Sequence, residues 1–182
     1  MLGLSTLGLF HTVVGLIALG YGAATLVRYQ FITPHTRPGR IYLWATFVTA
    51  ATGLGIFAHG HFGNAHVLSL MTLAALAVGT LASYSSWLGR ASEYVQAFGF
   101  SSTVFLHLIP GVTETATRLP RGGPWLASPD APELKIFAGV LLLGLLLGLA
   151  LQFRLLHLAR RSGVTLQAQR TVKPPQFVGG VS

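Results

Sequence analysis

Long runs of apolar residues, separated by short polar segments, dominate the chain. Four runs approach the roughly 20 residues that a helix needs to cross the hydrocarbon core of a bilayer. They cover about residues 4–27, 41–58, 67–88 and 136–153. A fifth run, about residues 95–112, is less apolar because it contains glutamine, serine, threonine and histidine. The pattern predicts an all-α integral membrane protein: a bundle of five transmembrane helices, or four if residues 95–112 do not span.

The basic residues favour the five-helix alternative. The loop after the first run carries three arginines and no acidic residue, and the carboxyl-terminal segment is rich in arginine. Short basic segments stay on the cytoplasmic side of a membrane. The first loop and the carboxyl-terminal segment both lie on the cytoplasmic side only if residues 95–112 span the membrane. We therefore expect the amino terminus outside and the carboxyl terminus inside. A single bundle would cover residues 1–160, with a mobile, basic cytoplasmic tail over residues 161–182.

Composition and charge point to the same environment. Of the 182 residues, 52% are hydrophobic and only 9% are charged, whereas a soluble domain carries about 25% charged residues. In a soluble protein the net charge of +8 would suggest nucleic acid. Here the arginines flank apolar runs, where they orient helices and meet lipid phosphates. Arg37, Arg40, Arg160 and Arg161 are assigned this role. We expect a multi-pass protein of the bacterial inner membrane, with the lipid bilayer and no nucleic acid as partner.

Seven histidines are the main candidates for chemistry. Polar groups at membrane depth are costly and usually face a bundle interior or a cavity. At a rise of 1.5 Å per residue, His11 lies about 10 Å below the outer surface and His107 about 12 Å below it. These two histidines are therefore expected at one level. His59, His61 and His66 belong to the short outer loop above them or flank it.

An acidic residue joins this group from the fourth helix. Glu114 follows His107 by seven residues, which is two helical turns, so the two side chains share nearly the same face. Pro110 lies between them and is expected to bend the helix. The segment would thus present an imidazole at depth and a carboxylate at the surface.

Three kinds of site remain open. His11 and His107, with His66, suit the iron of a b-type haem, and a redox protein would follow. His59, His61, His66 and Glu114 suit a single transition-metal ion. A string of histidine and glutamate can also pass protons, or transport or bind a small solute, without a cofactor. Each histidine also has a structural interpretation, as an interfacial hydrogen-bonding group at a helix end.

Other chemistry has little support. The chain has no cysteine, which excludes disulfides, thiolate metal sites and covalently attached haem. It has no Walker loop, H-E-x-x-H or G-x-S-x-G motif, so the sequence leaves open whether the protein is an enzyme.

The last apolar run suggests a contact with another protein. Gly144 and Gly148 form a small-xxx-small pair, which lets a neighbouring backbone approach closely in a membrane. We expect a membrane partner or a second copy to bind there. A non-catalytic subunit of a larger complex is therefore a third functional interpretation.

Four short strings in the first three apolar runs carry a family resemblance. They are Phe10-His11-Thr12, the segment 18–23, an H-x-x-x-G-R-I-Y string beginning at His35 and an H-x-L-S-L-x-T-L string beginning at His66. Over roughly residues 10–83 the chain resembles a family of bacterial predicted membrane proteins that share a domain of unknown function. The resemblance implies a helical membrane protein, singles out His11, His35 and His66, and implies no activity.

Overall fold

The computed structural model describes residues 6–56, 62–85, 88–119 and 123–161. These residues form five α-helices and one short 3-10 turn, and no strand occurs among them. The helices are α1 (Thr6–Tyr29), α2 (Arg37–Gly53), α3 (Asn64–Tyr84), α4 (Ser92–Arg118) and α5 (Pro132–Arg161), with η1 (Gly89–Ala91) before α4. The predicted all-helical fold is confirmed for the described residues.

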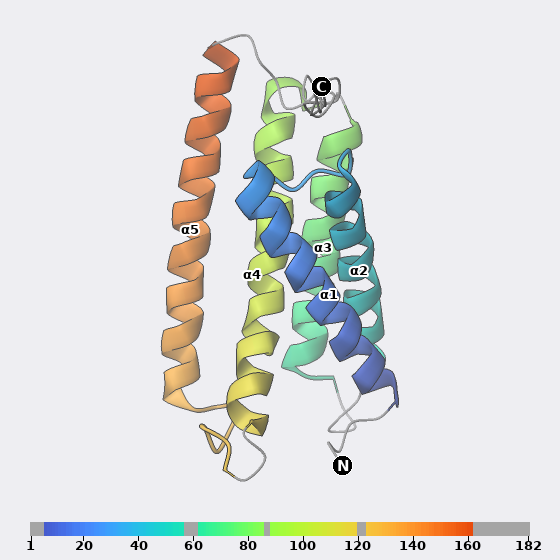
Figure 1. Cartoon of the computed structure of the whole chain (residues 1–182), viewed down its shortest axis with the longest axis vertical. Coiled ribbons are helices and arrows are strands. Elements are labelled where there is room, and N and C mark those ends of the chain that lie inside the picture. Colours follow the sequence, from blue (N-terminus) through green and yellow to red (C-terminus); the bar gives the residue numbers. More distant parts are fainter. Residues whose placement is uncertain (1–5, 57–61, 86–87, 120–122, 162–182) are drawn as a thin grey trace, which may run out of the picture.

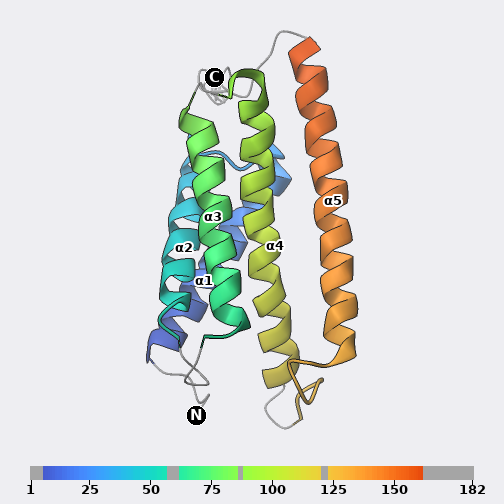
Figure 2. The ribbon, with the colours of Figure 1, turned by 180° about the vertical axis from the view of Figure 1, so that it is seen from behind.

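Successive helices run in opposite directions along one bundle (Figure 1). We call the end where α1, α3 and α5 begin the amino-terminal end, and the other the carboxyl-terminal end. Helices α1 to α4 pack closely, with α3 against α4 and α1 against α2 as the most extensive pairs. Helix α5 lies on the flank and packs against α4, as Figure 2 shows from behind.

In the described part of the chain, four helical segments are long and apolar enough to cross a membrane: α1, α3, η1 with α4, and α5. The run over residues 95–112, which is less apolar than the other four, is therefore among them. Helix α2 is not, because its 17 residues rise only about 25 Å, less than the roughly 30 Å of a hydrocarbon core. A fifth crossing through α2 and the orientation of the bundle stay predictions.

The predicted bounds of α2, residues 41–58, are wrong at both ends. The helix begins earlier because the Thr36 side chain accepts a hydrogen bond from Gly39 N and Pro38 occupies the first turn. These residues form an N-cap, which hydropathy does not detect. The helix ends at Gly53, and the backbone then turns through two hydrogen bonds between residues three apart, Gly55 N to Thr52 O and Ile56 N to Gly53 O.

Helices α4 and α5 are longer than the apolar runs that predicted them. Each continues into charged residues, α4 to Arg118 and α5 to Arg161. Pro110 lies inside α4 without ending it; in membrane helices, neighbouring groups satisfy the backbone atoms that a proline frees. The predicted tail begins at the last residue of α5, and the rest of it lies outside the described residues.

A close contact between α3 and α4 is made by glycines that the sequence analysis did not single out. A Cβ atom at Gly99 of α4 would lie 2.8 Å from both Ala75 O and Gly79 N of α3. The two backbones thus touch directly. By contrast, a Cβ at Gly144 or Gly148 would meet no atom within 4 Å. No residue of the described chain packs against the small-xxx-small pair. Its role in binding a partner stays a prediction.

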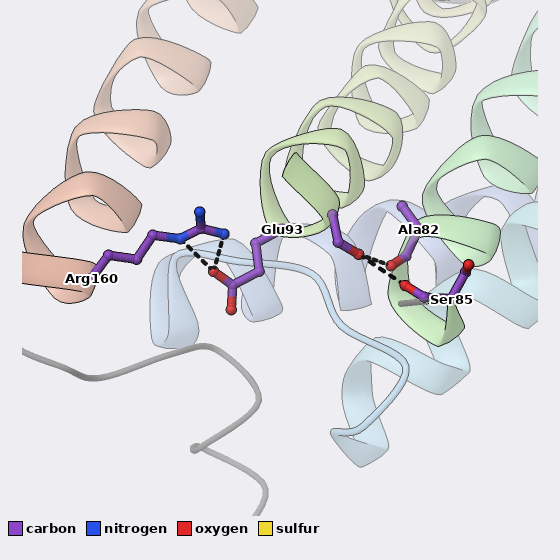
Figure 3. A network of polar contacts seen from close by, with 5 residues as sticks. Ala82, Ser85, Glu93 and Arg160 are labelled. Carbon is purple, nitrogen blue, oxygen red and sulfur yellow. Dashed lines mark hydrogen bonds and ion pairs between the residues drawn. The ribbon is translucent and has the colours of Figure 1, made fainter. Parts of the chain in front are cut away.

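A polar cluster fastens α5 to the bundle at the carboxyl-terminal end (Figure 3). Arg160 donates two hydrogen bonds to Glu93 Oε2, at 3.1 Å from Nε and 2.9 Å from Nη2. Its guanidinium also lies 4.9 Å from the centre of the Tyr94 ring. Ser92 hydrogen-bonds Ala82 O across the turn between α3 and α4. The assignment of Arg160 to lipid phosphate is therefore wrong, because a buried carboxylate holds its side chain.

Candidate functional site

A cavity of about 180 Å³ lies between α1, α2, α3 and α4 toward the amino-terminal end of the bundle. We call it the histidine cavity. Its polar lining comprises His11, Thr12, Thr49, Ser69, Thr72, His107, Glu114 and Arg118. The structure thus brings His11 of α1 and His107 of α4 to one cavity, as their matched depths predict.

The ring of His11 is oriented by α2. Its Nδ1 lies 3.1 Å from Thr52 Oγ1. The Thr52 hydroxyl donates its hydrogen to carbonyls of its own helix, at 2.8 Å to Val48 O and 3.0 Å to Thr49 O. A hydroxyl has one hydrogen; with that hydrogen on either carbonyl, the Thr52 oxygen accepts from His11 Nδ1. In the neutral imidazole, Nε2 then carries the lone pair.

The ring of His107 is fixed in the same way by its own helix. Its Nδ1 lies 3.0 Å from Thr103 O, and because a carbonyl only accepts, Nδ1 is the donor. Its Nε2 is buried and has no hydrogen-bond partner in the described part of the chain. A buried acceptor without a donor is costly, which marks this atom as one that a ligand would satisfy.

The hydroxyl groups around the cavity also present mainly acceptors. Thr12 donates to Gly8 O at 2.9 Å and Thr72 donates to Leu68 O at 2.8 Å, so both oxygens keep lone pairs and have no hydrogen left to give. Thr49 Oγ1 is buried without a hydrogen-bond partner in the described residues, and its hydroxyl can donate or accept a hydrogen bond. A wall of this kind selects a ligand that donates hydrogen bonds or carries positive charge.

Gly53 of α2 makes room for this arrangement. A Cβ at this position would overlap Ser69 Oγ and lie 3.3 Å from His11 Cε1. The absence of a side chain therefore allows α1 and α3 to bring their polar groups together beside α2.

An ion pair forms part of the cavity lining. Glu114 and Arg118 are exposed, line the cavity and form a salt bridge four residues apart on α4. Glu114 thus lines the same cavity as His107, as the spacing of two helical turns predicts.

The other candidate histidines lie elsewhere. His66 lies at the start of α3, where Gly63 N donates to its Nδ1 at 3.2 Å and its ring stacks on Phe62 at 4.9 Å. It is buried but does not line the histidine cavity. His35 is exposed against the edge of the Tyr84 ring, and His157 is exposed on α5.

The predicted metal set is only partly described. His59 and His61 lie outside the described residues. Within residues 6–56, 62–85, 88–119 and 123–161, no group of three or more histidine, aspartate or glutamate side chains is placed to hold a metal ion. The four-residue set of His59, His61, His66 and Glu114 stays a prediction.

Several residues of the cavity were not foreseen from the sequence. Thr49, Thr52 and Gly53 lie on one face of α2, and Ser69 and Thr72 lie on one face of α3. The usable signal is hydroxyl and glycine residues recurring at intervals of three or four within otherwise apolar runs, which marks the face of a helix turned toward a polar interior.

Comparison with known proteins adds no constraint, because the chain matches no family model, no curated protein and no solved structure. The family resemblance over residues 10–83 stays a prediction.

Proposed function

We propose that this chain is a multi-pass protein of the bacterial inner membrane whose histidine cavity binds a small cation. The Nε2 atoms of His11 and His107 are the proposed ligands. The observation that carries the proposal is the buried His107 Nε2, which has no hydrogen-bond partner among the described residues and belongs to a wall rich in acceptors.

A transition-metal ion fits this chemistry best. Neutral imidazole suits zinc, copper and nickel. In metal sites, a ligating histidine almost always donates its other ring N–H to an oxygen, which fixes the tautomer. His11 does so toward Thr52 and His107 toward Thr103 O. Water and the acceptor oxygens of the wall are available for the remaining coordination positions.

The size of the cavity favours an ion over haem b. Sites for drug-sized ligands occupy about 300–1,000 Å³, and a haem is at least that large. The histidine cavity, at about 180 Å³, has room for an ion and several water molecules. The predicted haem ligation by His11, His107 and His66 would also need His66 to leave its position at the start of α3.

The test is metal binding by the purified full chain, carrying an affinity tag without histidines. After stripping with a chelator, the protein is titrated with Co²⁺, whose visible spectrum reports nitrogen ligation. We expect one ion per chain in the wild type and much weaker binding in His107→Ala. The matched control His35→Ala, at the opposite end of the bundle, should bind as the wild type does.

Circular dichroism and gel filtration establish that each variant is folded before its affinity is compared. Equal cobalt binding by folded His107→Ala and wild type would overturn the proposal. A Soret band in the protein as purified would replace the ion with haem.

A second prediction concerns the orientation of His11. Thr52→Val keeps the shape of the side chain but removes the oxygen that accepts from His11 Nδ1. Loss of such an outer hydrogen bond typically weakens metal binding by about 10–100-fold, and we expect a loss in this range. The control is Thr115→Val, which removes an exposed hydroxyl that likewise bonds a carbonyl of its own helix, Gly111 O at 2.7 Å. Equal affinities of the two variants would contradict the assigned role of Thr52.

Proton transfer is the second candidate, and one observation favours it. Glu93, Gln96, Thr103, His107 and Glu114 follow one another on α4 at intervals of three, seven, four and seven residues, which places them along one face. The stripe rises about 32 Å, the thickness of a membrane core. However, fully buried Phe100 lies on the same stripe between Gln96 and Thr103. A pH-dependent activity that survives complete metal removal would favour this function over ion binding.

A further inference from the structure

A second hollow in the molecule lies on the flank, between α5, α4 and the end of α1. This groove, which we call the α5 groove, has a volume of about 890 Å³. Along α5 it extends from Val140 to Leu158, and its walls are mostly aliphatic and aromatic side chains. Gly144 and Gly148 form part of its wall, and a Cβ at either would meet no atom within 4 Å.

The polar contacts of α5 lie toward one end of the groove. Its polar and aromatic contacts to the bundle lie in its last third: Gln152 to Ser101, Leu156 and Phe153 in a cluster with Phe31, Ala97 and Tyr94, and Arg160 to Glu93. The residues before Gln152 make no polar contact of this kind in the described structure. From Val140 to Leu151, before these polar contacts begin, the groove lies between α5 and α4.

The groove becomes polar toward the carboxyl-terminal end. Ser101 Oγ donates to Gln152 Oε1 at 2.9 Å, and Gln152 Nε2 donates to Gln30 O at 2.7 Å. These groups satisfy one another and tie α4, α5 and the residue that follows α1 together. Arg154 also lines this part of the groove and is exposed.

The charge of Arg154 has no counterpart in the described chain. Arg118 pairs with Glu114, and Arg160 pairs with Glu93. No ion pair involves Arg154 among the described residues. A cation at the polar end of an apolar groove is complementary to an amphiphile with an anionic head.

We propose that the α5 groove binds an anionic phospholipid, with one acyl chain between α5 and α4 and the phosphate against Arg154. The length agrees: from Arg154 back to Val140 the helix rises about 21 Å, more than the roughly 15 Å depth of one leaflet of a 30 Å core. Basic pockets between transmembrane helices on the cytoplasmic side are known to bind lipid head groups. The proposal does not depend on ion binding in the histidine cavity.

The experiment compares lipids on the full chain in a mild detergent. Delipidated protein is titrated with phosphatidylglycerol or phosphatidylcholine of the same acyl chains, and bound lipid is counted by native mass spectrometry. We expect the wild type to prefer phosphatidylglycerol by about fivefold, the effect of one basic residue near an anionic head group, and Arg154→Gln to lose this preference. Arg161→Gln, with an exposed arginine at the end of the same helix, should keep it.

A second pair of variants tests the groove itself. Gly148→Leu places a side chain in the groove and should lower the binding of both lipids. Gly139→Leu is the matched control, because this glycine is exposed on the same helix, has no atom within 4 Å of a Cβ and does not line the groove. Equal lipid binding by these two variants, or no lipid preference in the wild type, would overturn the proposal.

The competing occupant is a second copy of the chain. Because the natural chain has no cysteine, Gly148→Cys introduces a single thiol. Rapid formation of a disulfide-linked dimer by this variant in native membranes would show that a second α5 lies against the glycines and would also overturn the proposal. We expect it to remain monomeric.

Discussion

Gly99→Val is expected to lower the free energy of unfolding by about 3 kcal/mol or more, the upper part of the range for overpacked cores. At this position a Cβ would lie 2.8 Å from Ala75 O and Gly79 N and 2.9 Å from Gly79 Cα. All three are backbone atoms of α3, so no side chain can rotate away. The helices must separate instead, and the contacts along the whole α3–α4 pair weaken. Denaturation of the purified protein in mixed micelles measures the loss.

Gly139→Val is the control for this prediction. It makes the same change in a helix, with the same effect on helix propensity, but nothing lies within 4 Å of the new Cβ. We expect it to be close to neutral. If both variants lost the same free energy of unfolding, the close backbone contact between α3 and α4 would be contradicted.

The same glycines show which packing details a single sequence conceals. Gly144 and Gly148 attract notice because they are four residues apart on one helix, a spacing visible in the sequence. Gly79 and Gly99 belong to different helices, and their proximity depends on how α3 and α4 cross. Periodicity locates apolar helices but not the point at which two of them touch.

The depth of a residue is more accessible to sequence reasoning than its contacts. Counting residues from the ends of the apolar runs is enough to place His11 and His107 at one level, because the rise per residue of a helix is nearly constant. The same counting places His66 beside the short loop before the third helix but not the direction of its ring, which local hydrogen bonding at the start of α3 sets. It also says nothing about Thr52, whose role follows from a contact with α1.

The ends of the helices are also hard to predict from hydropathy. The apolar run of α2 suggests a helix that ends near residue 58, whereas capping by Thr36 and the glycine-containing turn after Gly53 shift both ends toward the amino terminus. Helix α5, by contrast, extends beyond its apolar run into charged residues. Arg160 lies within the helix, because its side chain pairs with Glu93. Hydropathy locates the apolar part of a helix, whereas capping and ion pairs determine at which residue the helix ends.

Arg160→Met tests the ion pair at that end and should cost about 3 kcal/mol, the lower part of the range for removing one partner of a buried pair. The Glu93 side chain is only 10% exposed and loses two charged hydrogen bonds, and Tyr94 loses the cation over its ring. Since α5 is held mainly by its last third, we expect this helix to separate first, which proteolysis between α4 and α5 would detect.

The control for this change is the next residue. Arg161→Met removes the same charge from an exposed position at the end of α5 and should alter stability by less than about 0.5 kcal/mol. Glu93→Gln combined with Arg160→Met should recover part of the loss, because the buried carboxylate is then neutral and can still hydrogen-bond. If the double variant were instead as unstable as the sum of the two single changes, the two side chains would be acting independently, and the cost of Arg160→Met would have to come from lost packing of the arginine stem on Tyr94.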